Sequence, residues 1–320
     1  MAVLSPSERL SEEAPQRSNL SRWLGRDYAI AWPFMLPLMA VLIGLIAYPF
    51  ASALWLSLNR KMVGTDAVFI GPGNFYALLF GEQYSALFRK TVWVSFVFVA
   101  ASISLKFVLG MCMSLLLNER FRGRTLMRAI LFIPWAMPTL IVALSWKWIY
   151  EGSPSGLINK ILIQYFGSDQ IFQFLANPKY ALWSVIFAAI WQGTPFWTMM
   201  FLAGMQAIPT ELYEAAKIDG ANAFQRYLFI TMPQLRGVIV VTSLLSTIWT
   251  ANSINFIYIL TKGGPAGATM TFPMLAFDIG VAGPGGQLGL AAAISVIFFP
   301  IFIVAIFILT KRMLASDARA

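Results

Sequence analysis

The sequence predicts an all-α integral membrane protein with about six transmembrane helices. Of its 320 residues, 58% are hydrophobic and only 12% are charged, a balance typical of chains embedded in lipid. The mean hydropathy is +0.71. Apolar runs of ~20 residues recur along the chain, and a helix needs about that length to cross a bilayer core of ~30 Å. Composition and run length together favour a bundle of membrane-spanning helices.

The chain is predicted to have three parts. Residues 1–27 form a polar N-terminal tail, residues 28–310 form one transmembrane domain, and residues 311–320 form a short C-terminal tail. The apolar runs within the domain predict spans at about Ala29–Leu56, Thr91–Leu117, Leu126–Ile149, Ala181–Met205, Val238–Leu260 and Leu288–Leu309. The first run is too long for the core of a signal peptide, so we expect an uncleaved span.

The basic residues are unevenly distributed among the predicted connections. If both termini lie on one side, 14 of the 23 Lys and Arg residues fall on that side, seven fall on the other, and two lie within spans; Arg128, at the start of the third span, is counted with the connection before it. Because positive charge accumulates on the cytoplasmic side of membrane proteins, both termini are predicted to be cytoplasmic. The net charge of +9 is therefore interpreted as topology, and no nucleic-acid partner is expected.

Several kinds of chemistry are excluded by the residues that the chain lacks. It has one cysteine, Cys112, and no histidine, so it offers no disulfide framework and no Cys/His metal site. It has no Gly-Lys-Ser/Thr phosphate loop for binding ATP. The predicted spans contain no Asp or Glu, the groups that a proton-coupled carrier needs at bilayer depth. We therefore expect no catalysis, no metal and no cofactor in this chain.

Residues 206–236 form a polar loop between two long apolar runs. A helix is predicted to start near Thr210 and to be interrupted at Gly220. A second short helix is expected at about Ala223–Thr231, ending before Pro233. Small side chains would let another surface approach this backbone closely; they are Ala215, Ala216, Gly220 and Ala221. The alternative interpretation is an ordinary solvated loop.

This loop resembles the EAA motif of permease subunits in binding-protein-dependent ABC importers. The matching positions are Glu214, Ala215, Ala216, Gly220, Ile230, Met232 and Pro233. Met232 stands where the family usually has Leu, a change that conserves volume. Further segments resemble landmarks of the carbohydrate-uptake branch, the maltose and glycerol-phosphate type; they are "FIGPGNFYALL" from Phe69, "WKWIYEGSPSGLIN" from Trp146 and "YILTKGGPAGAT" from Tyr258. The resemblance covers nearly the whole chain.

The resemblance implies the type I ABC importer permease fold and the import of a sugar or sugar derivative into the cytoplasm. The energy would come from ATP hydrolysis, with Mg, in separate ATPase subunits. The implied partners are a second homologous permease, two copies of a cytoplasmic ABC ATPase and an extracytoplasmic solute-binding protein, in the lipid of a bacterial inner membrane.

By the same resemblance, the polar loop would be the coupling helix that inserts into the ATPase. The implied contact residues are Glu214, Ala215, Ala216, Asp219 and Gly220. The alternatives are a stand-alone ion-coupled secondary carrier and a membrane scaffold that transports nothing.

Polar and aromatic residues within the predicted spans are candidates for the substrate path. In the fourth span, Gly193 is expected to weaken the helix together with Pro195, next to the aromatic ring of Phe196. In the fifth span, helical spacing predicts one face formed by Ser246, Trp249, Thr250 and Ser253, with Asn252 nearby. Hydroxyl and amide groups beside aromatic faces suit a neutral polyol, although packing between helices is the alternative role.

The resemblance adds weight to these positions, because the sugar contacts of maltose permeases come from the segments matching Gly193–Phe196 and Ser246–Ser253. The side chains differ here, notably at Trp249 and Thr250, so the ligand can differ too. The second permease of such a pair can also hold most of the contacts, which leaves the share of this chain open.

Lys106 is a separate candidate. It lies about eleven residues, or ~17 Å, from the predicted cytoplasmic end of its span, and no acid in the predicted spans can neutralise it. It would bind an anionic substrate or pair with an acid of the partner permease. The alternative is a side chain that bends along its own stem towards water. The sequence leaves the identity and the charge of the substrate open.

Overall fold

The computed structural model describes residues 34–317, so the tail predicted for residues 1–27 lies outside the described residues. The chain divides into two units, residues 1–55 and 56–320. The first apolar helix, Phe34–Ser57, corresponds to the first predicted span. It contains a π-helical segment, η1 (Ile43–Ala47), and continues as α2 (Tyr48–Ser57). Its apolar side chains are exposed, with Leu45 74% exposed, as expected for a helix surrounded by lipid.

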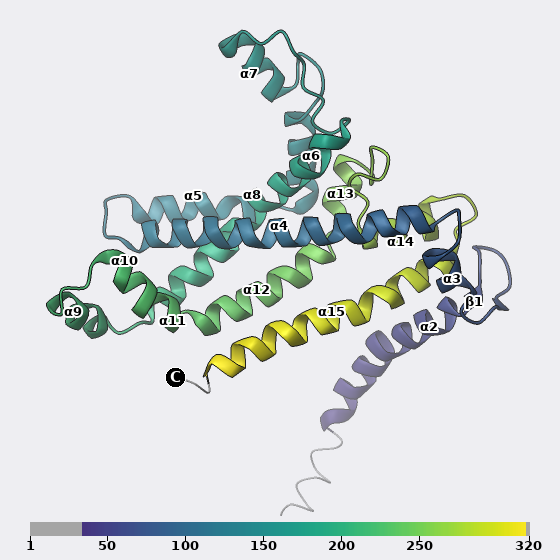
Figure 1. Cartoon of the computed structure of the whole chain (residues 1–320), viewed down its shortest axis with the longest axis horizontal. Helices are drawn as coiled ribbons and strands as arrows, with labels where there is room; N and C mark the ends of the chain where they lie inside the picture. The colour runs from purple at the N-terminus through teal and green to yellow at the C-terminus, as the bar shows by residue number, and fades with distance from the viewer. Residues whose placement is uncertain (1–33, 318–320) are drawn as a thin grey trace, which may run out of the picture. The chain divides into compact units, whose positions relative to one another are not determined.

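The second unit is almost entirely helical (Figure 1). Its longer helices are α4 (Ser85–Asn118), α5 (Arg124–Ala136), α6 (Thr139–Ile149), α7 (Leu157–Phe166), α8 (Pro178–Gln206), α12 (Arg236–Ala251) and α15 (Leu288–Asp317). Its short helical segments are α3 (Gly73–Leu79), α9 (Thr210–Ile218), α10 (Ala223–Arg226), η2 (Tyr227–Thr231), α11 (Met232–Gln234), α13 (Asn255–Leu260), α14 (Phe272–Phe277) and η3 (Asp278–Ala282). The strands β1 (Asn59–Arg60) and β2 (Val68–Phe69) pair antiparallel, with Asn59 opposite Phe69.

The apolar helices agree with the predicted all-α membrane class. Four helical stretches are long and apolar enough to cross a membrane: Phe34–Ser57, Ser85–Asn118, Pro178–Gln206 and Arg236–Leu260. The pair α5 and α6 forms a fifth candidate that is bent by 93°. The sixth predicted span falls on α15, whose apolar part within the searched residues is Leu288–Ile301. The helix continues to Asp317, into the predicted C-terminal tail, and the count of six crossings stays a prediction.

Two predicted spans are interrupted rather than continuous. The third breaks between Ala136 and Thr139, where Met137 and Pro138 have extended backbone with ψ angles of 140° and 132°. The residue before a proline is sterically disfavoured in the helical region, which explains why the first helix ends at this point. The fifth breaks after Ala251, and the chain resumes as α13. Both breaks matter because they border the same cavity.

Helix α4 packs along α8, and α12 packs against both. Gly110 of α4 permits this close approach, since a Cβ atom there would lie 2.6 Å from the Cβ of Trp197 on α8. Next to it, the rings of Phe107, Trp197 and Phe201 meet edge to face with centroids 5.5–6.0 Å apart. Such pairs add to the stabilisation from apolar packing. These three helices form the rigid frame of the site.

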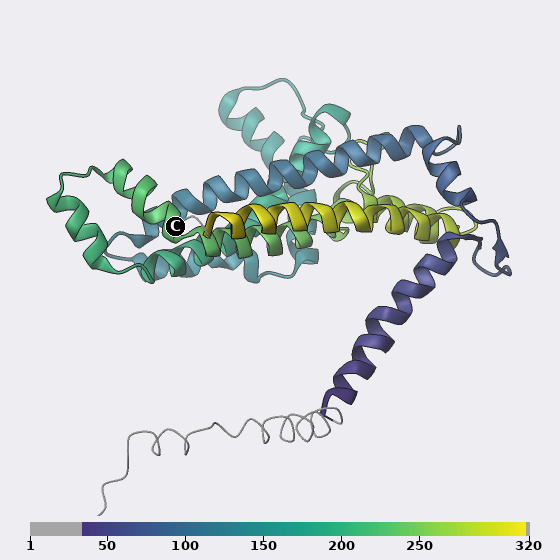
Figure 2. The same cartoon turned by 60° about the horizontal axis from the view of Figure 1, so that its bottom comes forward.

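The connections of the second unit group at its two ends. Figures 1 and 2 both place α9 to α11, the connection between α4 and α5, and the end of α15 together. The strands and α3 lie at the opposite end in both views. The first group carries most of the basic connections that the sequence assigns to one side of the membrane.

Candidate functional site

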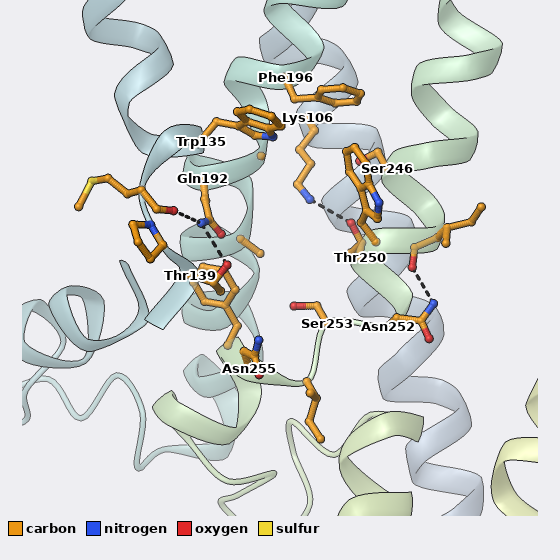
Figure 3. Close-up of a pocket in the computed structure, with 18 of the residues that line it drawn as sticks. Lys106, Trp135, Thr139, Gln192, Phe196, Ser246, Thr250, Asn252, Ser253 and Asn255 are labelled. Atoms are coloured by element: carbon orange, nitrogen blue, oxygen red, sulfur yellow. Dashed lines mark hydrogen bonds between the residues drawn. The ribbon is translucent and has the colours of Figure 1, made fainter. Parts of the chain in front are cut away.

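A cavity of about 620 Å³ lies between α4, the break of α5 and α6, α8, and the break of α12 and α13 (Figure 3). Eight of the residues that the sequence singles out as substrate contacts border it: Lys106, Gly193, Phe196, Ser246, Trp249, Thr250, Asn252 and Ser253. Trp191, the other aromatic candidate of the fourth span, does not border it. Segments far apart in the chain therefore converge on one space. That these residues bind substrate remains a prediction.

The side chain of Lys106 is only 5% exposed and reaches into the bundle. Its Nζ donates a hydrogen bond of 3.0 Å to Oγ1 of Thr250, as Figure 3 shows. A Cβ atom at Gly193 would lie 2.6 Å from Cε and 2.9 Å from Nζ of this lysine. The lysine therefore passes close to the backbone of α8 at Gly193, and it does not bend along its own helix towards water.

The expectation that Gly193 and Pro195 weaken the fourth span is wrong, because α8 runs unbroken through both. Nearby hydroxyl groups bind the carbonyl groups around the proline. Thr194 Oγ1 donates to the carbonyl oxygen of Ile190 at 2.7 Å, and Thr198 Oγ1 donates to that of Thr194 at 3.0 Å. Gly193 instead allows the side chain of Lys106 to lie close to the backbone of α8.

Aromatic rings form one wall of the cavity. Phe196 stacks with Trp135 at a centroid distance of 6.2 Å and an interplanar angle of 15°. Trp249 meets the same ring edge to face at 5.0 Å. Trp135 and Trp249 both line the cavity and are 41% and 50% exposed, so part of each ring is accessible. Flat apolar faces of this kind suit the C–H face of a sugar ring.

The fifth span presents its polar residues differently from the predicted single helical face. Helix α12 ends at Ala251, so Ser253 lies in the break and not one turn further along the same helix. Asn252 closes the helix by donating from Nδ2 to the carbonyl oxygen of Ile248 at 2.9 Å. Ser246 is 4% exposed and accepts a hydrogen bond of 3.0 Å from Trp197 Nε1. The break nevertheless keeps Ser253 at the cavity.

Sequence reasoning missed the contribution of the break between α5 and α6. Trp135 and Thr139 line the cavity from this break, together with Gln192 of α8. Gln192 Nε2 donates to the carbonyl oxygen of Met137 at 3.3 Å, which ties α8 to the break. The signal that points to this site is the pair of prolines in "PWAMPT" from Pro134, which interrupts an otherwise apolar run.

The coupling segment, residues 206–236, forms two helical arms with a tight turn between them. Gly220 has a φ of +80°, which favours glycine, and its N–H donates to the carbonyl oxygen of Lys217 at 3.1 Å. The N–H of Ala221 donates to the carbonyl oxygen of Ala216 at 2.8 Å, completing a Schellman motif. A capping box of Asn222 and Gln225 starts the second arm.

The second arm is longer than predicted. It continues from α10 through η2 and α11 to Gln234 and does not stop before Pro233. Pro233 stands in α11, which directly follows the π-helical segment η2 within this continuous helical arm. The hydroxyl groups of Tyr213 and Thr231, 2.9 Å apart, join the two arms.

The predicted coupling residues lie on the surface of the segment. Glu214, Ala215, Asp219 and Gly220 are exposed, and Ala216 is half-buried. Large apolar side chains are exposed around them: Ile218 is 87%, Phe224 67% and Phe229 76% exposed. Exposed apolar groups of this size mark a surface that contacts protein or lipid. Within residues 34–317, no three His, Cys, Asp or Glu side chains gather to hold a metal.

Comparison with known proteins places the chain in a family. Residues 106–313 match the family model described as the inner membrane component of binding-protein-dependent transport systems. The chain is 39% identical over 275 residues to the trehalose/maltose transport system permease protein MalF of Thermococcus litoralis, covering 86% of this chain and 90% of that protein. It is 30% identical to the trehalose transport system permease protein SugA of Mycobacterium tuberculosis, covering 88% of each.

A solved structure has the same fold. It belongs to a bacterial ABC transporter involved in the import of the acidic polysaccharide alginate, and its TM-score is 0.78 at 20% identity. The match covers 92% of this chain and 98% of that chain. The fold is thus that of a type I ABC importer permease, as the sequence predicts. By the extent of the family match and the identity to its relatives, the chain belongs to the inner membrane components of binding-protein-dependent transport systems.

Proposed function

We propose that this chain is the membrane-spanning permease subunit of an ABC importer that moves a sugar or sugar derivative into the cytoplasm. Relatives named for trehalose and maltose transport support the substrate class. As a transport component the chain catalyses no reaction; ATP and Mg act in separate ATPase subunits. The comparisons give no support to the alternative of an ion-coupled carrier.

The coupling segment carries this proposal. Its two arms present Glu214 and the small residues Ala215 and Gly220 at the surface, next to exposed apolar side chains such as Ile218. Small residues at the turn let another protein approach the backbone, while Glu214 offers a charge for a basic partner. An ATPase that closes on ATP would press on this segment, and the segment continues through α11 into α12, which lines the cavity.

The complete importer would contain further chains. We infer a second homologous permease, two copies of a cytoplasmic ABC ATPase and an extracytoplasmic solute-binding protein, in a bacterial inner membrane. Both termini would be cytoplasmic. The grouping of the coupling segment with the end of α15 at one end of the second unit supports the cytoplasmic placement of the C-terminus.

Co-purification tests this function. The tagged chain is expressed with the genes that neighbour its own and purified in detergent. We expect an ATPase to co-purify with the unmodified chain and to be lost from Glu214→Lys, because a basic side chain there would face the basic groups of its partner.

The matched control is Glu82→Lys, which reverses the charge of another exposed acid, in the connection between α3 and α4 at the opposite end of the second unit. This variant should keep the ATPase. Retention of the ATPase by Glu214→Lys, or its release by Glu82→Lys, would contradict the proposed contact. Sugar uptake by the lone chain in vesicles, driven by an ion gradient without ATP, would contradict the importer itself.

A further inference from the structure

We propose that Lys106 makes the cavity selective for a saccharide that carries a negative charge, such as a sugar phosphate or a uronic acid. The inference rests on the proposed function and specifies the substrate class of the same cavity. The ammonium group of Lys106 would bind the anionic group, while the rings of Trp135 and Trp249 contact the sugar.

The charge balance of the cavity is the first observation. Lys106 is the one charged side chain among the described residues that line it, and no Asp or Glu borders it. The lysine is 5% exposed and lies in the middle of a predicted span. An ammonium group at such depth is costly unless an opposite charge accompanies it. Because the lining residues supply none, the cavity is complementary to an anion.

The hydrogen bonds of the lysine are the second observation. An ammonium group has three N–H donors, and one of them bonds to Thr250 Oγ1 at 3.0 Å. Thr250 therefore holds the group beside the cavity while leaving donors for a ligand. Gly193 leaves room for the ammonium group in this position, since a Cβ atom there would lie 2.6 Å from Cε and 2.9 Å from Nζ of the lysine. Residues of α4, α8 and α12 together therefore set the position of the ammonium group.

Two of the neutral polar residues around the lysine are already engaged in hydrogen bonds within the protein. Ser246 already accepts a hydrogen bond from Trp197, and Asn252 donates to the end of its own helix. When a substrate displaces water from the cavity, a neutral sugar leaves the ammonium charge uncompensated. A phosphate or carboxylate cancels that charge and forms the stronger, charge-assisted hydrogen bonds.

Binding to the purified permease and ATPase complex tests this inference without the solute-binding protein, whose own selectivity would mask the effect. Three probes share one disaccharide: trehalose, trehalose 6-phosphate and the uronic acid of trehalose. Affinity is obtained from the dependence of the melting temperature on probe concentration. The variants are Lys106→Met, which removes the charge at similar length, and Lys106→Arg, which keeps it. Lys160→Met, at an exposed lysine of α7, is the matched control.

We expect the unmodified complex to bind at least one anionic probe about tenfold more tightly than trehalose. Lys106→Met should abolish that preference, chiefly through weaker binding of the anionic probe, whereas Lys106→Arg and Lys160→Met should retain it. The two anionic probes distinguish phosphate from carboxylate.

A preference for trehalose in the unmodified complex would overturn the inference, and that comparison needs no variant to fold. An anion preference that survives in Lys106→Met would also overturn it. So would a Lys106→Met chain that no longer assembles with the second permease but is rescued by Lys106→Arg, because the lysine would then pair with an acid of that subunit. ATP-dependent uptake of a neutral sugar would leave the proposed function intact in each case, whereas the absence of ATP-dependent saccharide uptake by the full importer would contradict that function.

Discussion

The coupling segment and the cavity are assembled in different ways. The coupling segment is local: its turn and cap are made within residues 216–225 by backbone bonds and one capping box. The cavity is assembled from α4, α5, α8 and α12, and its central hydrogen bond joins Lys106 to Thr250 across 144 positions of the chain. A single substitution in a local turn or cap is expected to cost little stability. The shape of a cavity between helices depends instead on how closely the helices approach one another.

The largest effect is expected at Gly110, where α4 meets α8. In Gly110→Leu, the new side chain would overlap Trp197, because a Cβ atom at Gly110 would lie 2.6 Å from the Cβ of that tryptophan. Overpacking of this kind costs about 3 kcal/mol, so the detergent-purified chain should lose most of its folded fraction in size-exclusion chromatography. Gly237→Leu on α12 is the control, because a Cβ atom there would have no neighbour within 4 Å. Equal yields of the two variants would contradict the close packing of α4 and α8.

A smaller effect, confined to the cavity, is expected for Gly193→Ala. The added methyl group would meet the flexible end of Lys106, which can move, so stability should fall by less than about 1 kcal/mol. The displaced lysine would lose its bond to Thr250, and the affinity of the purified permease and ATPase complex for an anionic probe should fall about tenfold. An unchanged affinity would show that the lysine does not act at this position.

The coupling segment should respond in the opposite way. Gly220→Ala places a side chain at a φ of +80°, at a strain cost of about 1 kcal/mol, although the space around it is open. Substrate affinity should stay unchanged, while substrate-stimulated ATP hydrolysis falls by about half or more because the turn is displaced. Uptake and ATPase assays of the reconstituted complex separate the two quantities. Loss of substrate affinity in this variant would remove the distinction between the two regions.

The smallest effect is expected for Tyr213→Phe. This change removes only the hydrogen bond of 2.9 Å between the hydroxyl groups of Tyr213 and Thr231, which is worth about 1 kcal/mol or less. The melting temperature should fall slightly, and proteolysis within residues 206–236 should become faster than in the unmodified chain. Equal proteolysis rates would show that the bond contributes nothing to holding the arms together.

Sequence reasoning succeeded where the deciding interactions are close in the chain. The apolar runs identified the membrane class, and the pattern around Gly220 predicted the two-armed segment, because turn geometry and capping depend on a few consecutive residues. It also placed the polar positions of α12 and Gly193 of α8 among the candidates for the site. It was less accurate in predicting where the helices are broken. The run Leu126–Ile149 bends at Met137, whereas α8 continues unbroken through Pro195.

The sequence by itself determined that the chain is helical, apolar and equipped with an exposed angled segment, because hydropathy and helix propensity act over short stretches. Only the tertiary structure decided that Lys106 faces Thr250, that Gly193 makes room for it, and that Trp135 joins the same cavity. The physical reason is that side chains on different helices meet only when the helices pack, and the packing distance is set by small residues such as Gly110 at the contact.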